Sequence, residues 1–254
     1  MHFPALFLAA ATVLLPPQKP SASMPPLTPA LSAPRPREHL LSPKLHVHPG
    51  LSHAPRVALT LDACTGKVDE RILKALIANN IKATVFVTAR WLKRNPEALK
   101  QMLARSDLFE IENHGARHLA AIDHPDLYFG VKAAASAEGI RREIEDGAAA
   151  VKQATGREPH WYRGAAAEYT ASALPIISSL GFKLAGYSLA GDGGATYSAR
   201  RAALAIAGAQ NGDVIIAHIN QPMKPAGVGV VEGILALKAK GYIFVRLDDR
   251  HLVH

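Results

Sequence analysis

The 254-residue chain contains a single cysteine, Cys64, which excludes an intramolecular disulfide. It also lacks an apolar run that could span a bilayer comfortably, because the apolar segment at the N-terminus ends at Pro16 and Pro17. Despite a net charge of +8, no block of Lys and Arg is interleaved with aromatic residues, so no nucleic-acid partner is expected. What remains after residue 56 is long enough to bury a core without disulfides.

The first residues have the length and composition of a secretory signal. Small side chains near Ser21, Ala22 and Ser23 offer a cleavage site, although His2 is the only basic residue before the apolar segment. We predict a signal peptide at residues 1–23, an exported (periplasmic or secreted) protein, and a mature form without a transmembrane span. A disordered or misassigned start is the alternative. Residues 24–55 are rich in Pro and Ser, which predicts an unpacked linker before a folded domain at residues 56–254.

From residue 56 onward, short apolar runs alternate with segments of helical period, which is typical of a parallel α/β sheet or barrel. The predicted strands are Val57–Asp62, Ile81–Val87, Phe109–Asn113, His160–Arg163, Phe182–Ser188, Val214–Ile219 and Tyr242–Leu247. The predicted helices are Asp69–Ala78, Pro96–Ala104, Ala137–Ala154, Ala171–Ser179, Arg200–Ala209 and Val230–Lys240. The fold class is therefore α/β.

Polar residues stand at or just beyond the carboxyl ends of five of these runs. They are Asp62, His114, Arg163, Asp192 and His218. In a β/α barrel the carboxyl ends of the strands converge on one face, so these side chains are expected to share one pocket.

His114 and His118 follow a predicted strand, where two imidazoles could bind one metal ion and leave a coordination position open. The absence of Glu at position 115 excludes the helical His-Glu-x-x-His arrangement, and Gly115 indicates a loop instead. The alternative is that two histidines four residues apart share a solvated helix face.

Over residues 57–250 the chain resembles the polysaccharide deacetylases of the NodB-homology type, or carbohydrate esterase family 4. Five stretches carry the resemblance: Leu59-Thr60-Leu61-Asp62, Asn113-His114-Gly115-Ala116-Arg117-His118, Tyr162-Arg163-Gly164, Asp192, and Ile215-Ile216-Ala217-His218. The resemblance implies a distorted, incomplete (β/α)7 barrel that binds one divalent metal, zinc or cobalt, and removes acetyl groups from an acetylated polysaccharide or oligosaccharide. It fixes no oligomeric state.

The resemblance also assigns roles to these residues. His114 and His118 match the two metal-binding histidines, and Asp62 matches the base that takes a proton from the attacking water. His218 matches the acid that protonates the departing sugar nitrogen. Arg163 would orient Asp62, and Asp192 would keep His218 protonated.

The chain departs from the family pattern at position 63, where Ala replaces an Asp that normally binds the metal. The third ligand could be Cys64, Asp62, a water molecule or nothing. The groove motifs differ too, because Arg163 is followed by Gly164 and Ala165 without the usual proline and aromatic residue. Two further functions therefore stay open: hydrolysis of another non-peptide amide, and glycan binding without catalysis.

Overall fold

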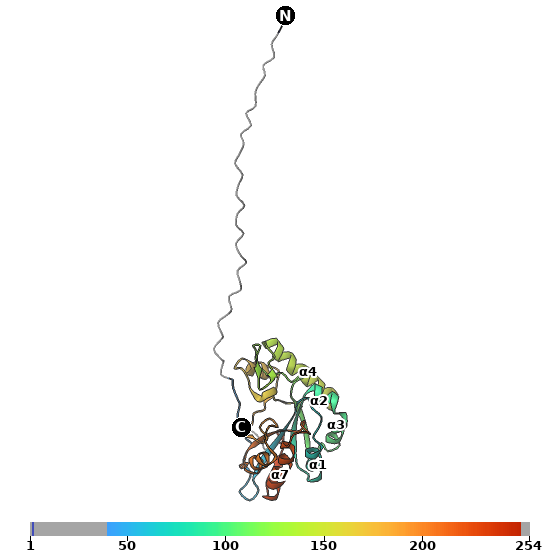
Figure 1. Ribbon diagram of the computed structural model, residues 1–254, viewed down its shortest axis with the longest axis vertical. Coiled ribbons are helices and arrows are strands. Elements are labelled where there is room, and N and C mark those ends of the chain that lie inside the picture. The colour runs from blue at the N-terminus through green and yellow to red at the C-terminus, as the bar shows by residue number, and fades with distance from the viewer. Residues whose placement is uncertain (1, 3–39, 250–254) are drawn as a thin grey trace. The chain divides into compact units, whose positions relative to one another are not determined.

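The structure is a computed structural model that describes residue 2 and residues 40–249 (Figure 1). The strands are β1 (Arg56–Ala63), β2 (Ala83–Val87), β3 (Phe109–Asn113), β4 (Leu127–Tyr128), β5 (Val131–Lys132), β6 (Trp161–Tyr162), β7 (Lys183–Leu184), β8 (Leu189–Ala190), β9 (Val214–His218) and β10 (Ile243–Val245). The helices are α1 (Glu70–Ala78), α2 (Ala89–Arg94), α3 (Pro96–Leu103), α4 (Ala137–Thr155), α5 (Ala173–Ser179), α6 (Ala199–Ala207) and α7 (Ala226–Ala239), with a 3₁₀ turn at Ala165–Ala167.

The strands form a parallel sheet in the order β7-β6-β3-β2-β1-β9-β8, and β10 pairs with the first half of β1. In the described part of the chain the two end strands, β7 and β8, share no ladder, so the barrel is incomplete along this seam. Figure 1 shows the strands of this sheet running through the centre of the folded domain, with helices around them. This is the distorted, incomplete (β/α)7 barrel that the sequence predicts, and the prediction is confirmed.

The side chains of strand β1 alternate between the two faces of the sheet. Because side chains alternate along a strand, Leu59, Leu61 and Ala63 enter the apolar core between sheet and helices. Thr60 and Asp62 lie on the other face and are nevertheless buried. The barrel interior therefore carries polar groups at the carboxyl end of its central strand.

The structure divides the predicted strand Phe182–Ser188. Only Lys183–Leu184 pairs with β6, and Leu189–Ala190 pairs with β9 on the opposite edge of the sheet. Between them the carbonyls of Ala185 and Gly186 accept hydrogen bonds from Arg163 instead of joining a ladder. Helix α2 and the β4–β5 hairpin were not predicted. Thr88 starts α2, because its hydroxyl accepts from the backbone N–H of Trp91 at 3.0 Å.

Residues 40–55, predicted to be an unpacked linker, pack against the barrel. Leu45 and Val47 are 7% and 2% exposed and belong to an apolar cluster with residues of the barrel interior. Leu41 exchanges backbone hydrogen bonds with Tyr169. The prediction was wrong for this segment because its composition gave no sign of these backbone contacts. The rest of the predicted linker and the predicted signal peptide lie outside the described residues, except for His2.

Among the residues that the structure describes, no helix is both long and apolar enough to cross a membrane.

Candidate active site

The strand ends bring the predicted residues of the first and last motifs together. Asp62 is the penultimate residue of β1 and the ladder partner of His218, the last residue of β9. On the other side of β1, the ladders join Asp62 to Phe86 and then Phe86 to Glu112, two residues before His114. The predicted convergence of these side chains on the carboxyl edge of the sheet is therefore what the structure shows.

Asp62 and Arg163 form a buried ion pair. Nη1 of Arg163 donates to Oδ1 of Asp62 at 2.9 Å, and the two side chains are 5% and 0% exposed. The same guanidinium donates to Thr60 Oγ1 at 2.9 Å and to the carbonyls of Ala185 and Gly186. All three of its nitrogens are engaged, so Arg163 is fixed in one orientation.

These charges decide the protonation of Asp62. Burial raises the pKa of its carboxyl group, but Arg163, His114 and His218 together lower the pKa further than burial raises it. The net pKa lies below the ordinary aspartate value. Asp62 is therefore ionised at neutral pH, as a base must be, and its Oδ2 lies 3.8 Å from Nε2 of His114.

His114 is oriented by its backbone surroundings. Its Nδ1 lies 2.6 Å from the carbonyl oxygen of Arg163, and a carbonyl can only accept, so Nδ1 carries a proton. The remaining ring nitrogen, Nε2, faces Cys64 and Asp62, and its lone pair becomes available to a metal ion once Nε2 gives up its proton. Burial lowers the pKa of His114, whereas Asp62 and Cys64 raise it by more.

His118 lies on a loop held by a buried glutamate from α4. Oε1 of Glu143 accepts from the backbone N–H groups of Arg117 and Leu119 at 2.7 and 3.1 Å. His118 itself has a φ of 65°, an unfavourable value that a loop maintains only when its surroundings hold it. Glu143 is therefore a positioning residue for His118.

Helix α4 can approach this loop because Gly147 has no side chain. A Cβ at Gly147 would lie 2.4 Å from Oδ1 of Asn113 and 2.6 Å from the carbonyl carbon of Gly115. That Asn113 oxygen accepts from the backbone N–H of Gly115, whose φ is 81°. The loop from Asn113 to Leu119 is thus fixed by both its own hydrogen bonds and the helix behind it.

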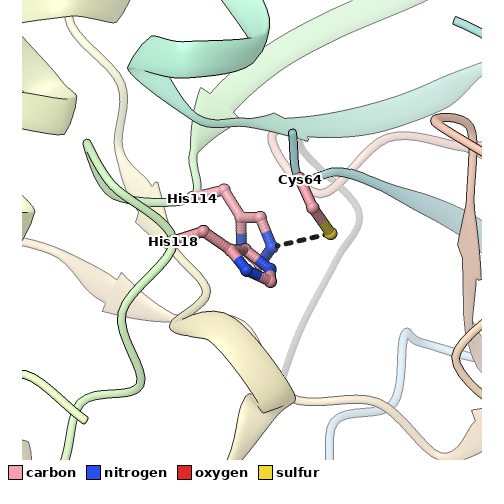
Figure 2. A group of neighbouring side chains, drawn as sticks. All are labelled: Cys64, His114 and His118. Atoms are coloured by element: carbon pink, nitrogen blue, oxygen red, sulfur yellow. Dashed lines mark hydrogen bonds between the residues drawn. The ribbon is translucent and has the colours of Figure 1, made fainter. Parts of the chain in front are cut away.

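Figure 2 shows Cys64, His114 and His118 pointing into one space. Their sulfur and nitrogen ligand atoms all lie within 4.8 Å of one another, and Cys64 Sγ is 3.6 Å from His114 Nε2. Burial raises the pKa of the Cys64 thiol, but the three histidines 114, 118 and 218 lower it well below its ordinary value. A thiolate and two imidazoles are a donor set that zinc accepts, so these residues fit a divalent metal.

A second group of possible ligands, Glu112, His160 and Asp248, fits a metal less well. Oε2 of Glu112 already accepts from the backbone N–H groups of His160 and Trp161. Burial raises the pKa of Glu112 to about 9, so this carboxyl group is neutral at physiological pH and a poor ligand.

His218 pairs with Asp192, which lies beyond the end of β8. Nδ1 of His218 is 3.0 Å from Oδ1 of Asp192, and Oδ2 of Asp192 accepts from the backbone N–H of His218 at 2.7 Å. Burial lowers the pKa of His218, but Asp192 and Cys64 raise it well above its ordinary value. The ring is therefore protonated at neutral pH, and Nε2 is the nitrogen left to deliver a proton.

The sequence did not indicate the roles of Thr60 and Glu143. Thr60 lies two residues before Asp62 on the same face of β1, so strand alternation could have pointed to it. Glu143 is buried on α4, and a charged residue among the apolar positions of a helix was the only available signal.

A cationic hollow of about 670 Å³ lies next to the site, lined by Thr65, Lys67, Arg90, Lys93 and Arg94. It joins the loop that follows Cys64 to α2, and Nη1 of Arg94 donates to the carbonyl of Thr65 at 2.8 Å. Backbone N–H groups at the start of α2 donate to the carbonyls of Gly115 and Ala116. The hollow is therefore lined by the loop that follows Cys64 and by α2, and α2 in turn contacts the loop that carries His114.

The solved structures most useful for comparison share this fold. A family 4 carbohydrate esterase from Streptomyces lividans, in complex with acetate, is 19% identical with a TM-score of 0.62, covering 79% of this chain and 97% of that one. A family 4 pseudoenzyme from Bacillus anthracis is 20% identical with a TM-score of 0.60, and the match covers 82% of this chain and 68% of that one. At these identities the likeness shows the fold alone.

Among curated proteins, an uncharacterized 30.6 kDa protein of Geobacillus stearothermophilus is 28% identical over 187 residues. The match covers 70% of this chain and 64% of that relative. The family model described as polysaccharide deacetylase matches residues 51–185, which is just over half of the 254 residues. The resemblance seen in the motifs is thereby confirmed, and the chain belongs to the polysaccharide deacetylase family.

Proposed function

We propose that this protein is a metal-dependent hydrolase that removes acetyl groups from an N-acetylated glycan. The observation that carries the proposal is the pairing of an ionised Asp62 with a protonated His218 across neighbouring strands, beside two converging imidazoles. A base and an acid with pKa values shifted in opposite directions are what amide hydrolysis requires.

The reaction assigns one role to each group. Water attacks the acetamide carbonyl carbon, and Oδ2 of Asp62 takes a proton from that water. Nε2 of His218 then gives a proton to the sugar nitrogen as the C–N bond breaks, which yields acetate and a free amine. Arg163 keeps Asp62 ionised, and Asp192 keeps His218 protonated.

His114 and His118 would hold one divalent metal ion, either zinc or cobalt. Bound there, the metal would supply Lewis-acid polarisation of the acetyl carbonyl. The cationic hollow beside the site favours a glycan that bears carboxylate groups, such as peptidoglycan, over a neutral chitooligosaccharide. An exported location, predicted from residues 1–23, is part of the same proposal.

Acetate release from N-acetylated oligosaccharides, measured with added zinc or cobalt and with a chelator, tests the proposal. Asp62→Asn should retain the metal and lose most turnover, His114→Ala should lose both, and His218→Ala should lose turnover alone. Retained turnover in the chelated wild-type protein would refute metal dependence.

A non-catalytic glycan-binding function is the second candidate, and Ala63 is the observation that favours it. Its side chain lies in the core between sheet and helices, so position 63 offers no metal ligand. The Bacillus anthracis neighbour is a pseudoenzyme, and a mutant of it has restored enzymatic activity. Glycan binding without acetate release under any metal would favour this candidate.

Hydrolysis of another non-peptide amide remains the third candidate. The turn after Arg163 favours it, because Gly164 and Ala165 stand there without the proline and aromatic residue of the family's groove motif. Turnover of such an amide, without acetate release from glycans, would distinguish it.

A further inference from the structure

The direction of side chains along β1 points to the residue that replaces the family's missing metal ligand. Asp62 lies on the site face, Ala63 faces the helices, and the next residue, Cys64, returns to the site face. Cys64 is 7% exposed and follows the last residue of the strand. The chain therefore presents a thiol to the site next to Ala63, whose side chain offers no metal ligand.

Cys64 is fixed before any ligand arrives. Its carbonyl oxygen accepts a hydrogen bond from the hydroxyl of Thr88, and the carbonyl of Ala63 accepts from the backbone N–H of Thr88 at 3.3 Å. Thr88 directly follows β2, so two adjacent strand ends hold this segment. A site that is assembled on strand ends in this way needs little rearrangement to bind a metal ion.

The distance between sulfur and nitrogen matches a shared tetrahedral metal. Bonds of about 2.3 Å to sulfur and about 2.0 Å to imidazole nitrogen, at a tetrahedral angle, separate the two donor atoms by about 3.5 Å. The observed distance from Cys64 Sγ to His114 Nε2 is 3.6 Å, and His118 completes the group within 4.8 Å (Figure 2).

Asp62 is the competing third ligand, and its contacts argue against that role. Oδ1 is already bonded to Arg163. Oδ2 lies 3.8 Å from Nε2 of His114, but Asp62 does not belong to the described group whose ligand atoms all lie within 4.8 Å of one another. Asp62 therefore remains available as the base.

We propose that Cys64 is the third protein ligand of the metal, so that the site is Cys-His-His. This inference rests on the metal dependence proposed above. A thiolate carries the same single negative charge as an aspartate, so the charge of the site is conserved. Its sulfur is a softer donor, which favours zinc or cobalt over magnesium and manganese.

Thiol titration tests the inference without measuring activity. Because Cys64 is the only cysteine in the chain, every thiol that reacts in the intact protein is Cys64. One equivalent of zinc should slow its modification by about tenfold or more relative to the chelated protein. His114→Ala should abolish this protection, whereas His160→Ala, which removes a member of the second ligand group, should leave it intact.

Cobalt provides an independent spectroscopic readout. The cobalt-loaded wild-type protein should show a near-ultraviolet sulfur-to-metal charge-transfer band. Cys64→Ser should lose the band and bind cobalt more weakly, and Cys64→Asp should bind cobalt without the band. The aspartate variant thus separates loss of sulfur from loss of the site.

The outcomes separate the inference from the proposed function. Stoichiometric zinc without thiol protection and without the cobalt band would overturn the Cys64 assignment while leaving a metal-dependent deacetylase intact. Protection and the band in a protein that releases no acetate would support Cys64 and refute deacetylation. A wild-type protein that takes up no metal would overturn both.

Discussion

Arg163 donates to Asp62 across the barrel interior while two of its other nitrogens hold the carbonyls of Ala185 and Gly186. These two carbonyls lie between β7 and β8, the strands that fail to close the sheet. One guanidinium therefore binds the segment that connects these two strands and also orients the candidate base. The shape of the barrel and the chemistry of the site depend on the same side chain.

Replacing Arg163 with Lys should raise the pKa of Asp62, because a lysine cannot reproduce the paired contacts of the guanidinium. Asp62 is needed ionised, so the acid limb of the pH profile of kcat/KM should move to higher pH. Thermal unfolding should also show that the free energy of unfolding falls by about 3 kcal/mol, because buried groups are left unpaired. An unmoved acid limb would show that Arg163 does not control Asp62.

Replacing Asp192 with Asn should lower the pKa of His218, because the carboxylate is the main group that raises it. In the wild-type protein His218 stays protonated well above its ordinary pKa, so the acid form persists into alkaline solution. In the variant, the basic limb of the pH profile of kcat/KM should therefore move to lower pH, and the acid limb should stay unchanged. A basic limb identical to that of the wild type would contradict the role of Asp192.

Replacing Glu143 with Ala should weaken metal binding although Glu143 touches no candidate ligand atom. The backbone N–H groups of Arg117 and Leu119 would lose their acceptor, and the strained His118 between them would be free to move. Zinc affinity, measured by competition with a chromophoric chelator, should fall by about 10-fold or more. Glu143→Gln keeps an acceptor oxygen and is the matched control, with affinity much closer to that of the wild type.

Replacing Arg90 and Lys93 with Glu should test the cationic hollow. Both side chains are exposed, and reversing their charge should raise KM for carboxylate-bearing acetylated glycans more than for neutral N-acetylglucosamine oligomers. kcat should change little, because neither residue is assigned to the chemistry. Equal changes in KM for both substrates would argue that the hollow does not contact the glycan.

Glu110, on the interior face of β3, predicts a pH dependence of stability that is separate from catalysis. Burial raises its pKa from 4.5 to about 7. Between these two pH values the folded state therefore retains a proton that the unfolded state releases. As pH rises from 4.5 to about 7, the free energy of unfolding falls by about 3 kcal/mol in all because of this group. Glu110→Gln should remove that part of the slope. Urea unfolding of both proteins at several pH values measures the difference, and parallel slopes would contradict the shifted pKa.

Sequence reasoning located the residues at or just beyond the carboxyl ends of strands, because position on a parallel strand fixes the edge where a side chain emerges. Asp62, His114 and His218 were found in this way. Glu143 and Thr60 act through contacts between elements, and local pattern carries little information on such contacts. The break in the strand predicted at 182–188 has the same origin, because it depends on a side chain about twenty residues earlier.

The packing of residues 40–47 bears on where this domain can be shortened. The carbonyl of Pro43 lies so close to Gly186 that a Cβ there would be 2.2 Å from it. Gly186 in turn accepts from Arg163. A recombinant protein trimmed to begin at residue 56 would expose that backbone and remove Leu45 and Val47 from the barrel interior. A recombinant protein that keeps these contacts therefore has to include residues 40–47, which lie upstream of the region that the family model matches.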